Sequence, residues 1–410
     1  MDTRRRALVL AYFFPPIAGA GAQRTLKFVR HLVPLGWDSI VVSTRSRVYG
    51  ARDETLLDEI PASTRVIRTL ALPVAHYAGV VLHHLRLRRL RTYVLWPDNG
   101  LGWFPFALLA ALRRASRDRP DVIFSTSAPY GGHLAALIVA RFTGIPWVAD
   151  FRDEWSNNPH LTGQPKRLTA LAARAERAIT ARAARVVVAA DYFELAGLGP
   201  DDPRRVEIVN GADGDDFSGA PPEPPADRFV LAHVGTLYLG DPSPLLRAVA
   251  ALAGRDEIDP EKVEVRLVGN VWLTGLEAPA GVRVEATGYV DHARAIAEMR
   301  GATALLLYVP SVSLAPSGKL FEYLASGRPI LCLTRPDSLA GRLVREWDAG
   351  AWADPDDQEG IERALLSLWR RWKESGLPDQ EEVRARALER YSRRAAAARL
   401  AQVLDEACGG

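Results

Sequence analysis

The sequence contains few cysteines, almost no net charge and no long uninterrupted apolar run. Two cysteines, Cys332 and Cys408, are too few for a framework of disulfides, so we expect a reducing compartment, the cytoplasm. The 52 Lys and Arg residues nearly balance the 49 Asp and Glu residues and leave a formal charge of +3. A global role in binding nucleic acid therefore has little support, and any anion site must be local.

No apolar run approaches the roughly 18 residues that would span a bilayer. The apolar stretch at 7–12 meets Phe-Phe-Pro-Pro at once, so no secretory leader is expected. Of the 410 residues, 48% are hydrophobic and 25% are charged, as is typical of a globular protein. At this length two to three domains are expected, and two is our working prediction.

Apolar runs alternate with amphipathic segments along the first half of the chain. The runs fall at 7–11, 122–124, 147–149 and 186–189, and the helical segments lie near 22–33, 131–142 and 166–184. This alternation predicts an α/β fold with a doubly wound parallel sheet. In such sheets ligands bind beyond the carboxyl ends of the strands, so the residues that follow each run are the candidates for a site.

Composition changes between 201 and 228, where Asp, Gly and Pro accumulate, and a second alternating series follows. Its strand-like runs lie at 229–233, 263–268, 282–286, 304–308 and 330–333. We predict two Rossmann-like domains, 1–203 and 204–380, and a terminal helix at 381–410 that packs back on the first domain.

The loop at 13–22 follows the first strand and opens a helix, a position that favours an anion. Gly19 and Gly21 would permit close approach, but the third glycine of a dinucleotide fingerprint is missing. The next strand also ends without an acidic residue for a ribose. A tight turn explains the loop equally well.

The segment 315–330 carries more information. Ser317 and Gly318 stand at a predicted helix start, and Lys319 lies in its first turn, three positions before Glu322. A cation is poorly placed there unless it meets a phosphate, and Glu322 is suited to accept both hydroxyls of a ribose. The alternative is a surface Lys-Glu pair.

An ordered set of short motifs covers nearly the whole chain. They are Tyr-Phe-Phe-Pro-Pro at 12–16, Gly-Ala-Gly at 19–21, Val-Ala-Asp-Phe-Arg-Asp-Glu-Trp at 148–155, Asn-Gly-Ala-Asp at 210–213, Val-Gly-Thr at 234–236, Gly-Tyr-Val at 288–290 and the segment 319–329. In this order the set resembles the retaining glycosyltransferases of family 4, which have the GT-B fold.

The resemblance implies a nucleotide diphosphate sugar held mainly by the C-terminal domain and an acceptor held mainly by the N-terminal domain, across a cleft. It assigns the donor to the following residues: Tyr289 near the base, Glu322 on the ribose, Ser317, Gly318, Lys319 and Thr236 on the phosphates, and Gly19 and Gly21 closing from the other side. Asn210-Gly211 would form the interdomain hinge. Two departures are Leu314, where the family has a glutamate, and the absence from 235–241 of the Arg and Lys found in many members.

For catalysis the strand ends of the first domain offer His133 and Asp150. His133 is alternatively a capping or core histidine, and Asp150 is alternatively a structural partner of Arg152; we favour acceptor binding or base function for Asp150. Arg152 and Asp153 complete the expected acceptor site. The family implies front-face transfer without an enzymatic nucleophile, in which Lys319 and helix amides stabilise the leaving diphosphate.

Two further features concern cofactors and partners. Asp213, Asp215 and Asp216 superficially match a metal-binding Asp-x-Asp, but an Asx turn explains them, and we expect no metal and no other cofactor. The basic stretch with Arg86, Arg88, Arg89 and Arg91 predicts peripheral contact with the inner face of a membrane, a solvated helix face or an anionic acceptor.

The sequence therefore predicts a metal-independent retaining glycosyltransferase of the hexosyltransferase or a related class. It would act on a nucleotide diphosphate sugar and a hydroxyl-bearing acceptor: a small molecule, a glycan or a lipid-linked sugar. The alternatives are a nucleotide-sugar epimerase of the same fold and a non-catalytic partner that binds nucleotide sugars, the latter favoured by Leu314.

Overall fold

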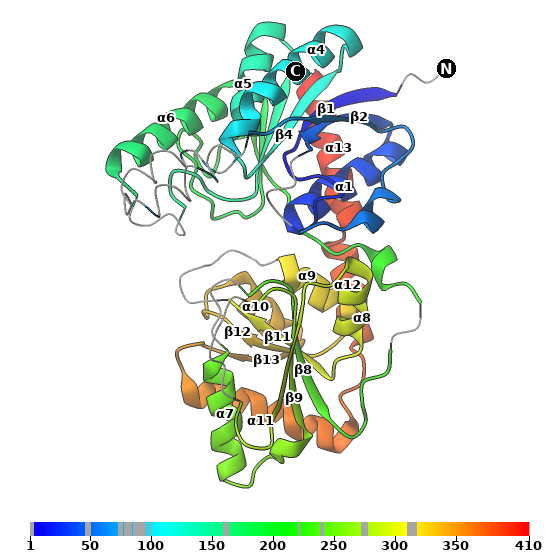
Figure 1. Cartoon of the computed structure of the whole chain (residues 1–410), viewed down its shortest axis with the longest axis vertical. Coiled ribbons are helices and arrows are strands. Elements are labelled where there is room, and N and C mark those ends of the chain that lie inside the picture. Colours follow the sequence, from blue (N-terminus) through cyan, green and yellow to red (C-terminus); the bar gives the residue numbers. More distant parts are fainter. Residues whose placement is uncertain are drawn as a thin grey trace. The chain divides into compact units, whose positions relative to one another are not determined.

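The chain forms two compact units (Figure 1). The first comprises residues 1–209 and 393–410, and the second comprises residues 210–392. The computed structural model describes residues 4–45, 51–72, 77, 84, 96, 98, 100–158, 164–219, 222–237, 242–271, 278–309 and 318–409.

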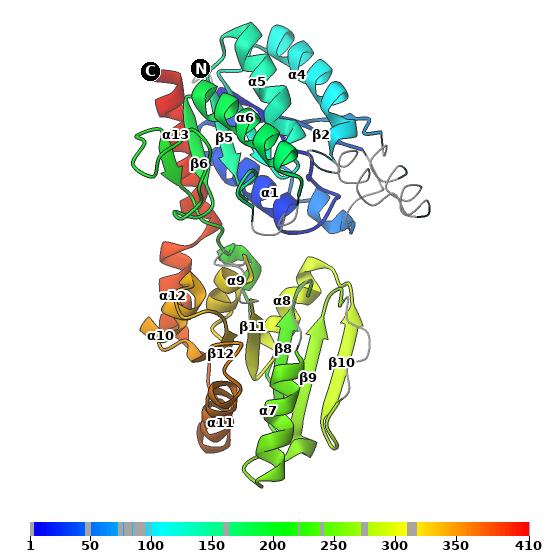
Figure 2. The same cartoon turned by 90° about the vertical axis from the view of Figure 1, so that its left-hand side faces the viewer.

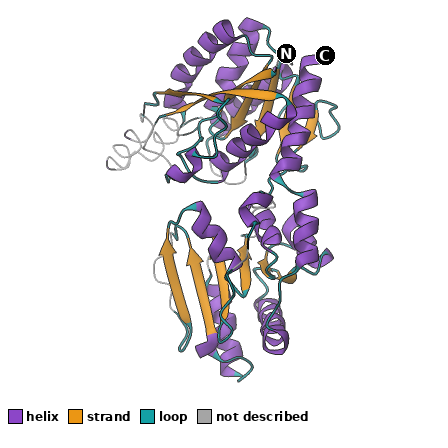
Figure 3. Ribbon diagram, turned by 90° about the vertical axis from the view of Figure 1, so that its right-hand side faces the viewer, coloured by secondary structure: helices purple, strands orange, loops and turns teal. Residues whose placement is uncertain are grey.

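A seven-stranded sheet forms the centre of the first unit, in the order β3-β2-β1-β4-β5-β6-β7, with all neighbouring strands parallel (Figure 3). The strands are β1 (Arg5–Leu10), β2 (Trp37–Thr44), β3 (Arg65–Thr69), β4 (Val122–Ser127), β5 (Trp147–Phe151), β6 (Arg185–Val188) and β7 (Arg205–Glu207). The helices are α1 (Ala20–Leu32), α4 (Phe104–Asp118), α5 (Gly131–Thr143), α6 (Lys166–Arg182) and α13 (Arg393–Gly409).

Helices cover both faces of this sheet. Leu8 and Leu10 of β1 belong to the apolar cluster that contains α4, α5 and α6, whereas Ala7 and Val9 belong to the cluster that contains α1 and α13. Successive side chains of a strand point to opposite faces, so a strand buried on both faces reads as a continuous apolar run. This is why the alternation of such runs predicts the layers correctly.

The second unit is built around a six-stranded parallel sheet in the order β10-β9-β8-β11-β12-β13. Its strands are β8 (Phe229–Val234), β9 (Val263–Val268), β10 (Arg283–Gly288), β11 (Ala304–Tyr308), β12 (Ile330–Leu333) and β13 (Gly350–Ala353). Its helices are α7 (Ser243–Gly254), α8 (His292–Arg300), α9 (Gly318–Ser326), α10 (Leu339–Glu346), α11 (Gln358–Ser375) and α12 (Glu381–Arg390). The predicted α/β fold with two Rossmann-like domains is confirmed.

Helices α7 and α11 bury one face of the second sheet (Figure 2). Val263 and Val265 of β9 point into this apolar layer, where Trp369 and Trp372 of α11 pack edge to face on Phe229. The alternate residues of β9 lie on the opposite face, which is polar in this part of the sheet.

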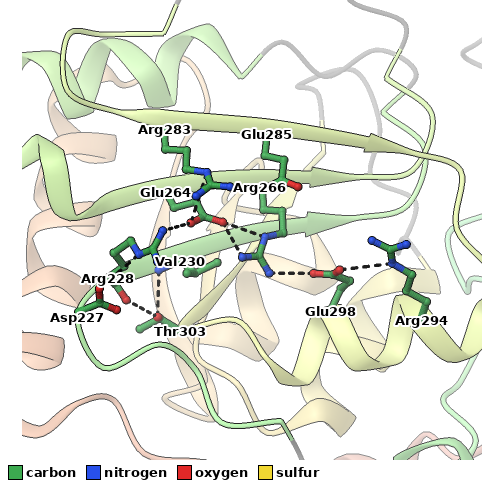
Figure 4. Close-up of polar contacts among 10 residues, drawn as sticks. All are labelled: Asp227, Arg228, Val230, Glu264, Arg266, Arg283, Glu285, Arg294, Glu298 and Thr303. Carbon is green, nitrogen blue, oxygen red and sulfur yellow. Dashed lines mark hydrogen bonds and ion pairs between the residues drawn. The ribbon is translucent and has the colours of Figure 1, made fainter.

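That polar face carries a network of ion pairs centred on Glu264 (Figure 4). Glu264 is only 2% exposed and accepts from Arg266 at 2.5 Å and from Arg228 at 3.4 Å. Arg266 also reaches Glu298 of α8 at 2.9 Å. A buried carboxylate needs such partners, since an isolated one would be strongly destabilising.

The terminal segment departs from the expected single helix at 381–410. It forms two helices, and the break falls at Tyr391, whose φ of −126° and ψ of 35° are not helical. The Tyr391 ring packs on Phe321 and on Trp347, and its carbonyl accepts from Ala212 N at 3.0 Å. These contacts hold α12 in the second unit, and only α13 packs on the first.

The first boundary also differs from the expected 203/204 and lies at 209/210. The reason is β7, which pairs in parallel with β6 and so belongs to the first sheet. Residues 210–212 and 391–392 run side by side, since Ala212 bridges Ser392. The predicted hinge at Asn210-Gly211 thus begins at the boundary between the units.

Candidate functional site

The carboxyl end of β8 meets the first turns of α9. Tyr323 of α9 fixes this junction, because its hydroxyl accepts from Val234 N at 2.8 Å and donates to Val234 O at 3.3 Å. Lys319 lies one turn earlier on the same helical face, and its Nζ donates to Thr236 O at 3.0 Å. The structure therefore brings together Lys319 and Thr236, two of the residues expected to hold the donor phosphates.

Lys319 is partly buried at the N-terminal end of α9. Burial lowers its pKa to about 8, although the negative charge of Glu322 acts to raise it. The positive end of the helix dipole also disfavours a cation at this position. A bound anion would offset both effects, so the local electrostatics favour a negatively charged ligand here.

His233 lies beneath this junction and is 1% exposed. Its Nδ1 is 3.1 Å from Leu306 O, and because a carbonyl can only accept, Nδ1 must carry the proton. Its Nε2 is then an acceptor, and it has no hydrogen-bond partner among the described residues. Burial and the charge of Lys319 lower the pKa of His233 to about 3, so the ring is neutral at physiological pH.

Three glycines with positive φ follow or end three adjacent strands. Gly235 (φ 126°), Gly269 (φ 116°) and Gly288 (φ 71°) stand at the carboxyl ends of β8, β9 and β10. Gly269 N donates to Gly288 O at 2.9 Å. Tyr289, expected near the base of the donor, follows directly and is 43% exposed. This rim of the sheet is therefore made of backbone, which a ligand can approach closely.

In the first unit, Asp150 is the penultimate residue of β5 and is completely buried. Its Oδ1 is 2.8 Å from Arg24 Nη2, and its Oδ2 accepts from Arg24 Nε at 3.2 Å and from Thr126 Oγ1 at 2.7 Å. Both carboxylate oxygens are thus engaged within the protein. The geometry favours the structural ion pair over the acceptor or base function preferred from the sequence, and the partner is Arg24 rather than Arg152.

Arg152 instead binds the chain that leaves β4. Its guanidinium donates to the carbonyls of Ser127 and Ala128, and burial lowers its pKa. A Cβ added to Gly21 would lie 2.0 Å from Arg152 Nη1, so Gly21 makes room for this guanidinium. Asp153 is exposed and remains accessible to an acceptor.

Gly19 precedes α1 with a φ of 103°, and its carbonyl accepts from the backbone N–H groups of Ala22 and Gln23 at 3.0 Å. No atom of the described residues lies within 4 Å of a Cβ built on it. The positive φ of Gly19 therefore requires glycine, whereas the space around it would accommodate a side chain. The turn interpretation accounts for Gly19 without a ligand.

His133 lies in the first turn of α5 and is fully buried. Trp147 Nε1 donates to Ser125 Oγ at 2.8 Å, and the same hydroxyl is hydrogen-bonded to His133 Nδ1 at 2.7 Å. Its Nε2 has no hydrogen-bond partner in the described part of the chain. Burial lowers the pKa of His133 to about 3, and a neutral ring that cannot easily take a proton is a weak general base.

The acidic run at 213–216 caps a 3-10 helix. Asp213 Oδ1 accepts from Asp215 N at 3.3 Å, and Asp216 pairs with His292 at 2.9 Å. Over the described ranges, no three His, Cys, Asp or Glu residues group in a way that could hold a metal ion. Within the same ranges, no helix is both long and apolar enough to cross a membrane.

Several sequence-predicted residues lie outside the described residues. They are Ser317 of the phosphate site, Leu314 and the basic residues Arg86, Arg88, Arg89 and Arg91. Gly318 is described as the first residue of α9, and Glu322 lies three positions after Lys319 on the same helix.

Sequence reasoning missed Arg24, Tyr323 and His233. Arg24 is a cation only five positions after Gly19, near the start of a helix, the same unfavourable placement that singled out Lys319. Tyr323 and His233 lie within apolar patterns and give no comparable signal. Their roles depend on contacts between segments that are distant in sequence.

Comparisons with known proteins agree with this geometry. Residues 19–211 match the glycosyl transferase 4-like domain, and residues 228–371 match the glycosyl transferases group 1 family. No curated protein shows significant sequence similarity to the chain. HepE from Anabaena, solved with UDP-glucose, is similar in structure with a TM-score of 0.63 at 15% identity, over 98% of this chain and 99% of that chain.

Sucrose-phosphate synthase from Thermosynechococcus elongatus is similar with a TM-score of 0.65 at 15% identity, over 97% of this chain and 98% of that chain. The two family matches fall on the two structural units, and together they span most of the chain. The protein is therefore an enzyme that belongs to the group 1 glycosyltransferases and has the GT-B fold of two Rossmann-like domains.

Proposed function

We propose that this enzyme transfers a sugar from a nucleotide diphosphate sugar to a hydroxyl-bearing acceptor, with retention at the anomeric carbon and without a metal ion. The observation that carries the proposal is the ammonium group of Lys319, held at the end of β8 by Thr236 O at 3.0 Å. It stands at the start of α9, beside a rim of glycine backbone.

This arrangement fits the leaving group of the reaction. A departing nucleoside diphosphate gains negative charge in the transition state, and a fixed cation with helix-end amides stabilises it. Lys319 supplies the positive charge that a metal ion supplies in other transferases. Glu322, on the same helix, takes the ribose hydroxyls as an acceptor.

Transfer without an enzymatic nucleophile is supported by Asp150. A nucleophile needs an accessible carboxylate oxygen, but both oxygens of Asp150 are bonded to Arg24 or Thr126 and the residue is buried. Front-face transfer needs no such group. Asp153 is exposed beyond β5, and we assign it to the acceptor.

The choice of a first donor follows from the structural comparison, in which HepE binds UDP-glucose. The direct test incubates the protein with UDP-, GDP- and dTDP-sugars and a panel of acceptors, with and without EDTA, and measures free nucleotide. We expect transfer that EDTA does not affect and that Lys319→Ala reduces roughly 100-fold or more, as for other fixed charges at transition states.

Two outcomes would contradict the proposal. Turnover that remains unchanged in Lys319→Ala would remove Lys319 from the site, and loss of turnover in EDTA would exclude metal independence. NMR of the product determines whether the anomeric configuration is retained. Release of nucleotide together with an altered sugar in acceptor-free buffer would instead identify an epimerase.

A further inference from the structure

Gly235 lies directly under the side chain of Lys319. A Cβ built on Gly235 would lie 2.1 Å from Lys319 Cε and 3.0 Å from Nζ. Real Cβ atoms essentially never approach another heavy atom closer than 3.0 Å. Any side chain at position 235 therefore excludes the observed conformation of Lys319.

The backbone at Gly235 is itself held in place. Its N–H donates to Val268 O at 2.7 Å, which ties it to β9. A Cβ built on Gly269 would lie 2.8 Å from Gly235 O. The backbone of Gly235 is thus packed closely against Gly269, and its N–H is fixed by β9.

Helix α9 is equally constrained from the other side. The Tyr323 hydroxyl binds both backbone polar groups of Val234, the residue before Gly235. The methylene groups of Lys319 pass over the backbone of Gly235, and its Nζ donates to Thr236 O. With helix and strand both fixed, a new methyl group at 235 can be accommodated only by moving the lysine.

We propose that Gly235 is a positioning residue for the ammonium group of Lys319, and that Gly269 maintains the backbone conformation that this requires. The functional part of this inference rests on the proposed donor-binding role of Lys319. The steric part does not, because it follows from the contacts alone.

The experiment compares Gly235→Ala with Gly376→Ala. Gly376 caps α11 with a φ of 72°, and no atom in the described part of the chain lies within 4 Å of its built Cβ, so its alanine variant carries backbone strain without a clash. UDP-glucose affinity is measured by calorimetry, and kcat and KM are measured in the transfer assay. Gly235→Ala is expected to weaken UDP-glucose binding roughly 10- to 100-fold, the effect of losing a hydrogen bond to a charged group, and to lower kcat, whereas Gly376→Ala leaves both unchanged.

A double-mutant cycle shows whether Gly235 acts through Lys319. In a Lys319→Ala background, Gly235→Ala is expected to change the affinity less than about twofold, because coupled residues are not additive. An additive loss, or no loss in the single variant, would overturn the inference.

A second measurement is independent of any donor. The rate at which acetic anhydride labels Lys319 is followed against pH by mass spectrometry, with the exposed Lys166, Lys262 and Lys373 as internal references. In Gly235→Ala the midpoint for Lys319 is expected to move from about 8 towards that of an ordinary lysine, since a displaced side chain regains water. An unchanged midpoint would overturn the positioning role. A shifted midpoint in a protein that binds no nucleotide sugar would leave it intact and contradict the proposed function instead.

Discussion

Arg24 and Asp150, 126 positions apart in the sequence, form a two-point ion pair in the interior of the first unit. Their side chains are 2% and 0% exposed. The guanidinium also donates to the carbonyls of Ile208 and Val209, the last two residues before the chain passes from the first unit to the second. One buried charge pair thus ties together α1, β5 and the segment that leads to the second unit.

We predict that Asp150→Asn destabilises the protein by about 3–5 kcal/mol, because it leaves the buried Arg24 charge uncompensated. The loss in the free energy of unfolding is measured from the first transition of a urea denaturation curve. The double variant Arg24→Met with Asp150→Leu should be less destabilised than Asp150→Asn, since no unpaired charge remains. A double variant that is less stable than the single one would argue against a mainly structural pair.

We predict that the affinity for UDP-glucose decreases as the pH rises through about 8. Burial lowers the pKa of Lys319 to about 8, so above this pH the free protein loses the charge that binds the diphosphate. Binding of the anion raises this pKa, and the association constant should then decrease by up to about tenfold per pH unit. Calorimetry between pH 6.5 and 9 measures the slope.

Lys319→Arg provides the control for this pH dependence, because a guanidinium stays charged over the whole range. Its affinity for UDP-glucose is expected to be lower at pH 7 but nearly constant with pH. A wild-type profile as flat as that of the variant would show that another group provides the charge.

Tyr323→Phe should destabilise the second unit by about 1–3 kcal/mol. The change removes the acceptor of Val234 N–H, and an unsatisfied buried donor has this order of effect. Tyr391→Phe is the matched control: its ring packs on Phe321 and Trp347, and its hydroxyl has no hydrogen bond within the described residues. Equal melting temperatures for the two variants would contradict the role of the Tyr323 hydroxyl.

Gly211→Ala is expected to be strongly destabilising, by more than about 2 kcal/mol, the range of severe overpacking. A Cβ there would lie 2.4 Å from the backbone carbonyl of Tyr391, which cannot rotate away. For Gly214→Ala, three positions on, the new Cβ meets Leu388 Cδ2 at 3.7 Å and no closer atom of the described residues, so this variant serves as the control. Chemical denaturation of both variants tests the close approach of the two chain segments.

The strands that the sequence predicts best are those buried on both faces. The runs at 304–308 and 330–333 coincide with β11 and β12, because apolar side chains are required on both sides of a covered parallel sheet. By contrast, β3 and β7 lie at the two edges of the first sheet, and their residues are partly exposed. Without a continuous apolar run they give no comparable signal.

The break between α12 and α13 shows a second limit. No glycine or proline lies between 381 and 407, so local propensity favours one continuous helix. The helix ends because Tyr391 packs on Phe321 and Trp347, which are distant in sequence. The site shows both outcomes: helix electrostatics singled out Lys319 and the family resemblance added Thr236, whereas the partner of Asp150 depended on tertiary contacts.

The discontinuity of the first unit has a consequence for the order of events during translation. Leu400, Val403 and Leu404 of α13 belong to the same apolar cluster as β1 and α1. At typical rates of synthesis of about 5–20 residues per second, they emerge roughly 10 to 40 s after the sheet of that unit. Until then one face of the sheet is covered by α1 without α13, so the first unit can complete its core only after the second has been made. During that interval the apolar side chains that α13 covers in the folded unit stay exposed on the nascent chain.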